Sequence, residues 1–299
     1  MDKMPVKVLI LGGNGMLGHK AWMVFRRHFD TYITVRRSFS YYEHYNLFDK
    51  QQTFDNIDVT CFETVKEVIE RIKPQVIVNC IGIIKQLSAS NGPLESIKIN
   101  ALFPHCLAKI CNNSGVRLIH ISTDCVFSGN KGQYTEDDPS DAEDLYGKTK
   151  FLGEVTYGGA LTLRTSIIGH ELNSQRSLLE WFLSQKGKRI KGYTEAIFSG
   201  FTTKMLCDII LDIVGHHKEL SGLYHISSEP IDKFNLLSLI KQIYKLNIEL
   251  EPDDRVVCDR SLDSGRFRKI AGFRPFSWEE MVVDMHNDVA FYEALRRKK

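Results

Sequence analysis

A tyrosine and a lysine four residues apart form the clearest candidate for chemistry in this sequence. They are Tyr146 and Lys150 of the segment YGKTK, and on a helix this spacing places both side chains on one face. A cation beside a phenol favours the phenolate, so we expect Lys150 to lower the pKa of Tyr146. Tyr146 would then be a proton donor to a carbonyl oxygen near neutral pH. Thr123, in the segment ISTDCVF, can hydrogen-bond the same oxygen.

A glycine loop near the start of the chain predicts a nucleotide cofactor. The segment GGNGMLG follows an apolar run and precedes a helical pattern, which is the context that such a loop requires. Glycines let the backbone turn tightly and approach a pyrophosphate, and the following helix directs its amide dipole at the phosphates. The residues expected to contact the cofactor here are Gly12, Asn14, Gly15, Met16, Leu17 and Gly18.

Two arginines stand where the second strand is expected to end. An acidic residue about 20 residues after the glycine loop usually indicates NAD, because it binds the ribose hydroxyl. Here Arg36 and Arg37 occupy that position, and their charge and forked donors suit a 2′-phosphate, so the sequence favours NADPH over NADH. The alternative is that these arginines are merely solvated. Further along, Asp58 and Val59 could contact the adenine, although Asp58 could equally cap the next helix.

The first half of the chain alternates between short apolar runs and amphipathic helical patterns. This alternation predicts an α/β fold of the Rossmann type, a doubly wound parallel sheet with helices on both faces and right-handed crossovers. Thr123 falls at the carboxyl end of a strand, where open sheets of this kind bind ligands. The expected strands are Val6–Leu11, Thr31–Val35, Gln75–Cys80, Arg117–Ser122 and Ala160–Ser166, and the expected helices are Met16–His28, Cys61–Ile72, Leu94–Cys111 and Glu143–Val155.

The second half of the chain is less regular and predicts a smaller C-terminal subdomain for the substrate. Its expected elements are helices at Ser177–Gln185, Thr203–Val214, Phe234–Tyr244 and Ser277–Ala294 and a strand at Gly222–Ile226, with loop-rich segments at 186–201 and 251–275. The predicted cofactor domain comprises residues 1–168 and about 200–218, and the substrate subdomain comprises 169–199 and 219–299. With no obvious linker, the two parts are expected to share a continuous interface.

Composition excludes several classes of protein. The 299 residues are 43% hydrophobic and 25% charged, the ordinary mix of a globular enzyme, and the net charge of +2 favours neither a nucleic-acid nor a membrane partner. No run reaches the roughly 18 apolar residues that span a bilayer, and the N-terminus lacks the pattern of a signal peptide. Seven cysteines without CxxC spacing argue against a disulfide framework or zinc site and indicate reduced thiols in the cytoplasm. No acid cluster calls for a metal.

Taken together, the motifs resemble those of extended short-chain dehydrogenases/reductases, especially the dTDP-4-dehydrorhamnose reductase family of nucleotide-sugar reductases. The resemblance rests on GGNGMLG, VIVNC, STDCVF, YGKTKFLGE and LRTS and covers nearly the whole chain. It implies an NADPH-dependent reduction of a nucleotide-linked 4-keto-6-deoxy sugar, for deoxysugar or cell-surface polysaccharide biosynthesis. Tyr146 would protonate the C4 ketone, Lys150 would bind the nicotinamide ribose, and Thr123 would orient the ketone. Asn100 would support Lys150 through water, unless it is a helix-bending or surface amide.

The same resemblance implies the remaining contacts. It places Cys80, Ile81, Gly82, Ser166 and Ile167 at the cofactor, in addition to Asn100, Tyr146 and Lys150. It places Lys85, Asp124, Cys125, Val126, Trp181, Phe198, Arg260 and Arg266 at the sugar nucleotide. Arg260 and Arg266 are candidates for the diphosphate, or else solvated charges. Similar enzymes often dimerise, so a homodimer is a further expectation.

Cys125 distinguishes this chain among its relatives. Nucleotide-sugar dehydratases carry an acid directly after Thr-Asp, so the thiol at this position makes dehydration a poor interpretation. GDP-fucose synthases, which epimerise and then reduce, have a cysteine at the spacing that Cys125 has from Thr123, and His170 lies near their second acid/base. A bifunctional 3,5- or 3-epimerase/4-reductase using Cys125 and His170 is therefore an alternative. A third hypothesis is a non-catalytic regulatory subunit, as in methionine adenosyltransferase. Neither the nucleotide base nor the sugar stereochemistry follows from the sequence.

Overall fold

A seven-stranded parallel sheet forms the centre of the molecule. The computed structural model describes residues 5–172, 174–274 and 276–297. The sheet has the order β11-β6-β5-β4-β1-β2-β3, and every pairing in it is parallel, as the alternating pattern predicts. Its strands are β1 (Lys7–Leu11), β2 (Asp30–Thr34), β3 (Thr53–Phe54), β4 (Val76–Asn79), β5 (Arg117–Thr123), β6 (Leu161–Thr165) and β11 (Gly222–His225).

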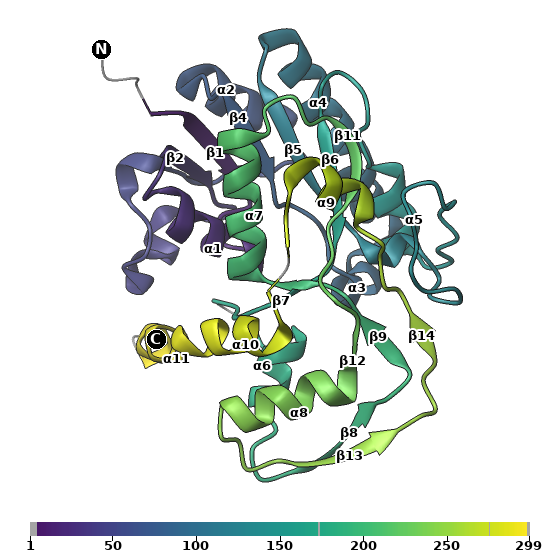
Figure 1. The fold of residues 1–299 in the computed structure, drawn as a ribbon. Coiled ribbons are helices and arrows are strands. Elements are labelled where there is room, and N and C mark those ends of the chain that lie inside the picture. The colour runs from purple at the N-terminus through teal and green to yellow at the C-terminus, as the bar shows by residue number, and fades with distance from the viewer. Residues whose placement is uncertain (1–4, 173, 275, 298–299) are drawn as a thin grey trace.

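Helices cover both faces of this main sheet (Figure 1). Alternate residues of each strand face opposite sides, so Val8 and Ile10 pack with α1 and α7 whereas Leu9 and Leu11 pack with α2 and α4. The helices are α1 (Met16–Phe25), α2 (Phe62–Ile72), α4 (Phe103–Ser114), α5 (Leu145–Leu152) and α7 (Thr203–His216). Both faces are buried, which is why these strands read as continuous apolar runs rather than alternating ones. The predicted Rossmann-type fold is confirmed.

A small lobe lies beyond the carboxyl ends of the main strands (Figure 1). It consists of α6 (Leu178–Leu183), β8 (Arg189–Tyr193), β9 (Ala196–Phe198), β12 (Ile231–Asp232), α8 (Lys233–Ile243), β13 (Glu249–Asp253) and β14 (Cys258–Asp259). Its strands form the sheets β12-β9-β14 and β13-β8. The prediction of loop-rich segments at 186–201 and 251–275 is therefore wrong. These strands are short and pair with partners distant in sequence, so they leave little local signal.

Three predicted boundaries need correction. β11 pairs with β6 and extends the main sheet, so residues 222–225 belong with the cofactor half rather than with the substrate subdomain. The expected helix Leu94–Cys111 is three elements: α3 (Lys85–Ser96), a π-helical turn (Ile97–Leu102) and α4. The closing helix breaks at Asp288 into α10 (Trp278–Asn287) and α11 (Val289–Arg297), where the Asp288 carboxylate accepts a hydrogen bond from Lys20 at 2.7 Å.

The remaining short elements are the β7–β10 pair and α9. β7 (Ile167–Ile168) pairs in parallel with β10 (Phe201–Thr202), and α9 (Gly265–Ala271) contacts β11. Three 3₁₀ turns lie between β2 and β3 (Phe39–Tyr41, Glu43–Tyr45 and Lys50–Gln52), and a fourth follows β5 (Asp124–Val126). All seven cysteines are free thiols. Across the described ranges, no helix is both long and apolar enough to cross a membrane.

Candidate active site

The predicted catalytic residues meet at the carboxyl end of β5. Thr123 is the last residue of that strand, and Tyr146 and Lys150 lie on α5, which contacts β5. α5 begins there because the Asp144 side chain accepts from the Gly147 amide at 2.8 Å and caps the helix. Gly147 allows the approach, since a Cβ on it would lie 2.3 Å from the Cys125 carbonyl oxygen. The Thr123 side chain lies close enough to the Tyr146 phenol to lower its pKa against the effect of burial.

Tyr146 does not have the lowered pKa that the sequence predicts. Burial raises its pKa above 10, and Cys125 and Asp124 add to the increase, while the hydrogen bond with Thr123 opposes it. The Lys150 ammonium donates to the Ile121 carbonyl oxygen at 2.8 Å and does not offset this rise. The predicted lowering of the Tyr146 pKa is therefore wrong. Tyr146 is held as a protonated phenol, which is the form that a proton donor requires.

Lys150 is almost wholly buried. Burial lowers its pKa to about 8, whereas the negative charge of Glu154 opposes this change. A Cβ on Gly82 would lie 3.9 Å from the Lys150 ammonium, so the loop after β4 runs directly beside the cation. The lysine therefore lies close to titration at working pH.

Asn100 supports the loop after β4. Its Oδ1 accepts from the Ile83 amide at 2.7 Å, and its Nδ2 donates to the Ile83 carbonyl at 3.0 Å. It lies in the π-helical turn, where the helix packs so closely on Gly153 that a Cβ there would be 1.8 Å from the Asn100 carbonyl oxygen. π-turns often occur at functional sites. The alternative of a surface amide is excluded because Asn100 is only 1% exposed.

The glycine loop has the close backbone contacts expected of a pyrophosphate cradle. Gly12 has a φ of +86°, a conformation that favours glycine. A Cβ on Gly18 would lie 2.1 Å from the Gly12 carbonyl oxygen, so α1 can pack on the loop only with glycine there. The loop is also bonded to the end of β2, because the Gly13 amide donates to the Thr34 carbonyl at 2.8 Å. The residues present therefore fit a dinucleotide.

The two arginines after β2 are placed beside the expected adenine end. Arg36 donates to the Asp58 carboxylate at 3.2 Å, and both side chains are exposed. The Arg37 guanidinium lies over the Tyr41 ring at 4.3 Å from its centroid. Asp58 also accepts from the Thr60 amide at 3.0 Å, and these hydrogen bonds lower its pKa even though burial raises it. Asp58 thus closes a turn before α2, whose N-cap is Cys61 without a side-chain capping bond, so the alternative of a helix cap is wrong.

The other predicted cofactor residues lie in three segments, which follow β4, follow β6 and precede α2. Ile81 lies against the glycine loop, because a Cβ on Gly12 would be 2.8 Å from its Cγ1. Burial raises the pKa of the Cys80 thiol to about 12, so it is neutral. The Ser166 carbonyl accepts from the Phe201 amide at 2.9 Å, which joins Ile167 in β7 to β10. Val59 is buried with the apolar residues of α2 and α4, whereas the carboxylate of the preceding residue, Asp58, is exposed.

Cys125 and His170 do not form a pair. Cys125 lies beside Tyr146, but burial and the Asp124 charge raise its pKa to about 12, so it is a neutral thiol. His170 is buried elsewhere: its Nδ1 lies 2.8 Å from Glu180 and its ring stacks on Tyr292. The thiolate–imidazole set required for epimerisation is thus not assembled.

Some predicted substrate residues lie near the catalytic cluster. Burial opposes ionisation of Asp124 and raises its pKa, although Arg260 and Lys233 both counteract this. Arg260 donates to the carbonyls of Phe127 and Ser128 at 2.7 and 3.0 Å, which fixes its guanidinium beside Cys125 and Asp124. Lys85 forms an ion pair with Asp144 at 2.7 Å.

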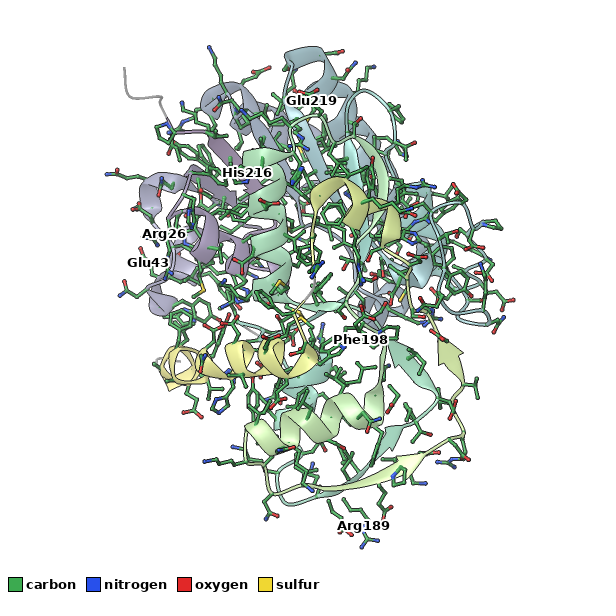
Figure 2. The ribbon with its side chains drawn as sticks, in the orientation of Figure 1. Arg26, Glu43, Arg189, Phe198, His216 and Glu219 are labelled. Carbon is green, nitrogen blue, oxygen red and sulfur yellow. The ribbon has the colours of Figure 1, made fainter. Side chains whose placement is uncertain are left out.

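Other predicted substrate residues have different positions. Val126 is wholly buried against Phe127 and Tyr134, so its side chain faces the interior. Phe198 is 9% exposed and packs on Trp278, where β9 meets the main body (Figure 2). Arg266 donates to Asp137 at 2.7 Å on the surface, which is the solvated alternative rather than a diphosphate contact. Trp181, on α6, is 38% exposed and stays a candidate.

A buried charge pair behind the site escaped the sequence reasoning. Arg164 donates two hydrogen bonds to Glu154, at 2.8 and 2.7 Å, and both side chains are less than 5% exposed. Glu154 also accepts from Ser122 at 2.6 Å. The only available signal was that Glu154 follows Lys150 by one helical turn and that Arg164 interrupts an apolar strand. The other omission is Lys233, which acts on Asp124 from the start of α8.

Residues 6–256 match the family described as the RmlD substrate binding domain. Among curated proteins, the spore coat polysaccharide biosynthesis protein SpsK of Bacillus subtilis is 26% identical over 241 residues, 73% of this chain and 81% of that protein. A dTDP-4-keto-6-deoxy-D-glucose reductase of Streptomyces niveus is 28% identical over 49% of this chain and 45% of its own length. The methionine adenosyltransferase 2 subunit beta of Mus musculus is 33% identical over 50% of this chain and 41% of its own length. The chain thus spans less than half of the last two relatives.

The fold also matches known structures along its whole length. The dTDP-4-dehydrorhamnose reductase of Bacillus anthracis, crystallised in complex with NADP, superposes with a TM-score of 0.77 at 22% identity. That match covers 95% of this chain and 100% of the other. At this identity the likeness concerns the fold. Within the described residues, no group of three or more His, Cys, Asp or Glu side chains is placed to hold a metal ion.

Proposed function

The chain belongs to the RmlD substrate-binding domain family, an extended short-chain dehydrogenase/reductase family, and we propose that it reduces the C4 ketone of a nucleotide-linked 4-keto-6-deoxy sugar with NADPH. The observation that carries this proposal is the contact of the Tyr146 phenol with the Thr123 hydroxyl beside a buried Lys150. This cluster stands at the carboxyl edge of the sheet, where folds of this kind bind ligands, and the glycine loop follows β1 in the same sheet.

The proposed chemistry assigns one task to each residue of the cluster. A nicotinamide held at this edge would supply a hydride to C4, and the ketone oxygen would take up a proton. Tyr146 supplies that proton, since its pKa is raised and the phenol is protonated throughout the working range. Thr123 donates to the same oxygen and orients it. Lys150 would hold a positive charge at the nicotinamide ribose, as the resemblance implies.

NADPH is proposed because Arg36 and Arg37 stand directly after β2, where binders of NADH usually carry an acid. Asp58 is the nearby carboxylate, and Arg36 already neutralises it at 3.2 Å. A 2′-phosphate could take the exposed Arg36 guanidinium as a forked donor, whereas the ribose hydroxyl of NADH would gain less from it. Polysaccharide or deoxysugar biosynthesis is the proposed setting, which similarity to the spore coat protein supports.

A screen of nucleotide 4-keto-6-deoxy sugars with NADPH tests the proposal. Cofactor oxidation is followed by absorbance, and NMR identifies the product. We expect turnover with at least one substrate and a loss of about 10²–10⁴-fold in kcat for Tyr146→Phe. If the wild type binds NADPH but oxidises it with none of the ketosugars, reduction is the wrong activity. Incorporation of solvent deuterium beside the ketone without cofactor would instead favour the epimerase.

A separate binding experiment tests the preference for NADPH over NADH. Arg36→Ala is expected to weaken NADPH binding about tenfold and to leave NADH binding nearly unchanged, because only NADPH carries the 2′-phosphate. Dissociation constants are measured by fluorescence titration. Arg26→Ala is the matched control, since this arginine lies over Trp22 and donates to Leu47. Equal losses for both cofactors in Arg36→Ala would contradict the preference.

A second candidate function is supported by the similarity to a methionine adenosyltransferase subunit. In that case the chain would bind cofactor and a partner protein without turnover. Tyr146→Phe distinguishes the two functions, because a regulatory subunit would retain its partner-dependent effect in this variant. The grouping of Thr123 and Asp124 beside the Tyr146 phenol favours catalysis.

A further inference from the structure

A buried polar chain joins the C-terminal helix to the glycine loop. His19 lies on α1 and Tyr292 on α11, and they are 0% and 1% exposed. The His19 Nε2 and the Tyr292 hydroxyl are 2.7 Å apart. On the other side of the ring, the His19 Nδ1 lies 2.7 Å from the carbonyl oxygen of Gly15, in the glycine loop. Two short contacts therefore connect residues 273 positions apart in sequence.

The chemistry of these atoms determines the direction of both hydrogen bonds. A carbonyl oxygen can only accept, so the His19 Nδ1 must carry the ring proton and donate to Gly15. The Nε2 is then an acceptor, and the Tyr292 hydroxyl donates to it. Burial lowers the pKa of His19 to about 3, so the ring is neutral and this single tautomer is maintained. The Gly15 carbonyl thus fixes the tautomer, and the Tyr292 hydroxyl holds the ring in place by donating to the nitrogen on its other side.

The Gly15 carbonyl belongs to the peptide group whose other end is the Met16 amide. A peptide group is planar, with its carbonyl and N–H pointing in opposite directions. The Gly15 carbonyl accepts from the His19 side chain and, at 3.1 Å, from the His19 backbone amide. Holding that oxygen over the helix therefore directs the Met16 N–H, the first amide of α1, out of the helix end. That end is where a dinucleotide places its phosphates.

Tyr292 is itself held from the small lobe. Its ring stacks on His170, with 4.4 Å between centroids, and His170 bonds to Glu180 of α6 at 2.8 Å. The Arg296 guanidinium of α11 also pairs with Glu180. One turn earlier, Lys20 of α1 pairs with Asp288 at 2.7 Å. α11 is thus fastened to the lobe on one side and to α1 on the other, between the two parts seen in Figure 1.

We propose that Tyr292 is a positioning residue for the cofactor, acting through His19 to orient the Gly15–Met16 peptide toward the phosphates. The inference rests on the proposed nicotinamide cofactor. It gives the C-terminal helix a role in cofactor affinity, although no residue of that helix belongs to the glycine-loop motif. It also explains why the residue after Gly18 is a buried histidine on a helix packed against an apolar core.

Tyr292→Phe tests this role. The variant keeps the ring that stacks on His170 and removes only the hydroxyl that donates to the His19 Nε2. Its dissociation constant for NADPH is expected to rise about tenfold, as for the loss of one hydrogen bond to a buried group. Tyr244→Phe is the matched control, because the Tyr244 hydroxyl lies in the same cluster, 3.5 Å from His170 Nε2, with no contact to His19. That control should bind NADPH within twofold of the wild type.

A double-mutant cycle separates positioning from general destabilisation. In His19→Asn the side-chain amide can donate from the Nδ1 position but cannot reach Tyr292. If Tyr292 acts through His19, the effects of His19→Asn and Tyr292→Phe on NADPH affinity are non-additive in the double variant. Equal affinity of Tyr292→Phe and the wild type, an equal loss in Tyr244→Phe, or additivity in the cycle would each overturn the inference. Wild-type NADPH binding, measured in the same titration, reports on the proposed cofactor independently.

Discussion

The main sheet and the small lobe are stabilised by different kinds of contact. Residues 8–11 of β1 are wholly buried between helices, and the close approaches around the glycine loop involve backbone. In the small lobe, β8 is largely exposed, and Arg189 at its start forms ion pairs with Glu249 and Glu251 of β13. Figure 2 shows Arg189 at the end of the lobe farthest from the main sheet.

This difference corresponds to the two tasks of the proposed enzyme. A nucleotide cofactor is bound by fixed backbone amides, so the elements that present them have to be rigid. A sugar nucleotide is selected by side chains on short strands and loops, which can vary without loss of the sheet. We therefore expect substitutions behind the cofactor edge to be costly and substitutions on the outer lobe to be tolerated.

The largest contrast is expected between two ion pairs. Glu154→Gln removes the partner of the buried Arg164, and breaking such a pair costs about 3–5 kcal/mol in the free energy of unfolding. Glu249→Gln removes a partner of the exposed Arg189, and such pairs contribute less than about 1 kcal/mol. Urea denaturation of the two variants measures the difference. Similar losses in both would show that the lobe is as tightly determined as the sheet.

The next contrast compares two glycines in helices that pack on the main sheet. Gly18→Ala places a methyl group 2.1 Å from the Gly12 carbonyl oxygen, so the loop must move. We expect NADPH affinity to fall about 100-fold, equivalent to roughly 2.7 kcal/mol. Gly215→Ala, in α7, meets nothing within 4 Å and should leave affinity unchanged while raising stability by up to about 1 kcal/mol. Intact NADPH binding in Gly18→Ala would mean that the loop is adaptable.

The same contrast explains which elements could be predicted from sequence. β1, β4 and β5 are buried on both faces, so they appear as apolar runs, and the predicted strands agree with them to within one or two residues. The strands β8 and β13 pair with each other across 60 residues, and β8 carries polar side chains, so pattern alone suggested loops. The π-turn at Asn100 depends on the approach of Gly153, which is a tertiary contact.

Within the site, residue types were easier to predict than their electrostatic state. Thr123, Tyr146 and Lys150 were identifiable because their motifs follow a glycine loop in order. The direction of the Tyr146 pKa was not, since it depends on burial and on the Lys150 ammonium donating to Ile121. The role of His170 depended on α6 and α11 folding around it, so its position near the second acid/base of GDP-fucose synthases was misleading.

The smallest expected effect is a pH dependence set by Lys150. Burial lowers its pKa from 10.5 to about 8, so the ammonium is present below that pH and is lost as pH rises through it. The Tyr146 phenol stays protonated there, because its own pKa is raised. The value of kcat/KM for NADPH, which reports the free enzyme, should be constant below about pH 8 and fall tenfold per unit above it.

Lys150→Arg provides the control for this assignment, because a guanidinium does not lose its proton in this range. Its kcat/KM is expected to be lower throughout, since the forked group differs in shape from an ammonium, but independent of pH between 7 and about 9.5. Glu154 raises the pKa of Lys150, so Glu154→Gln should move the alkaline limb of the otherwise wild-type enzyme to lower pH. If the alkaline fall in kcat/KM persists unchanged in Lys150→Arg, a group other than Lys150 titrates there. In that case the buried charges behind the site would not act on catalysis through Lys150.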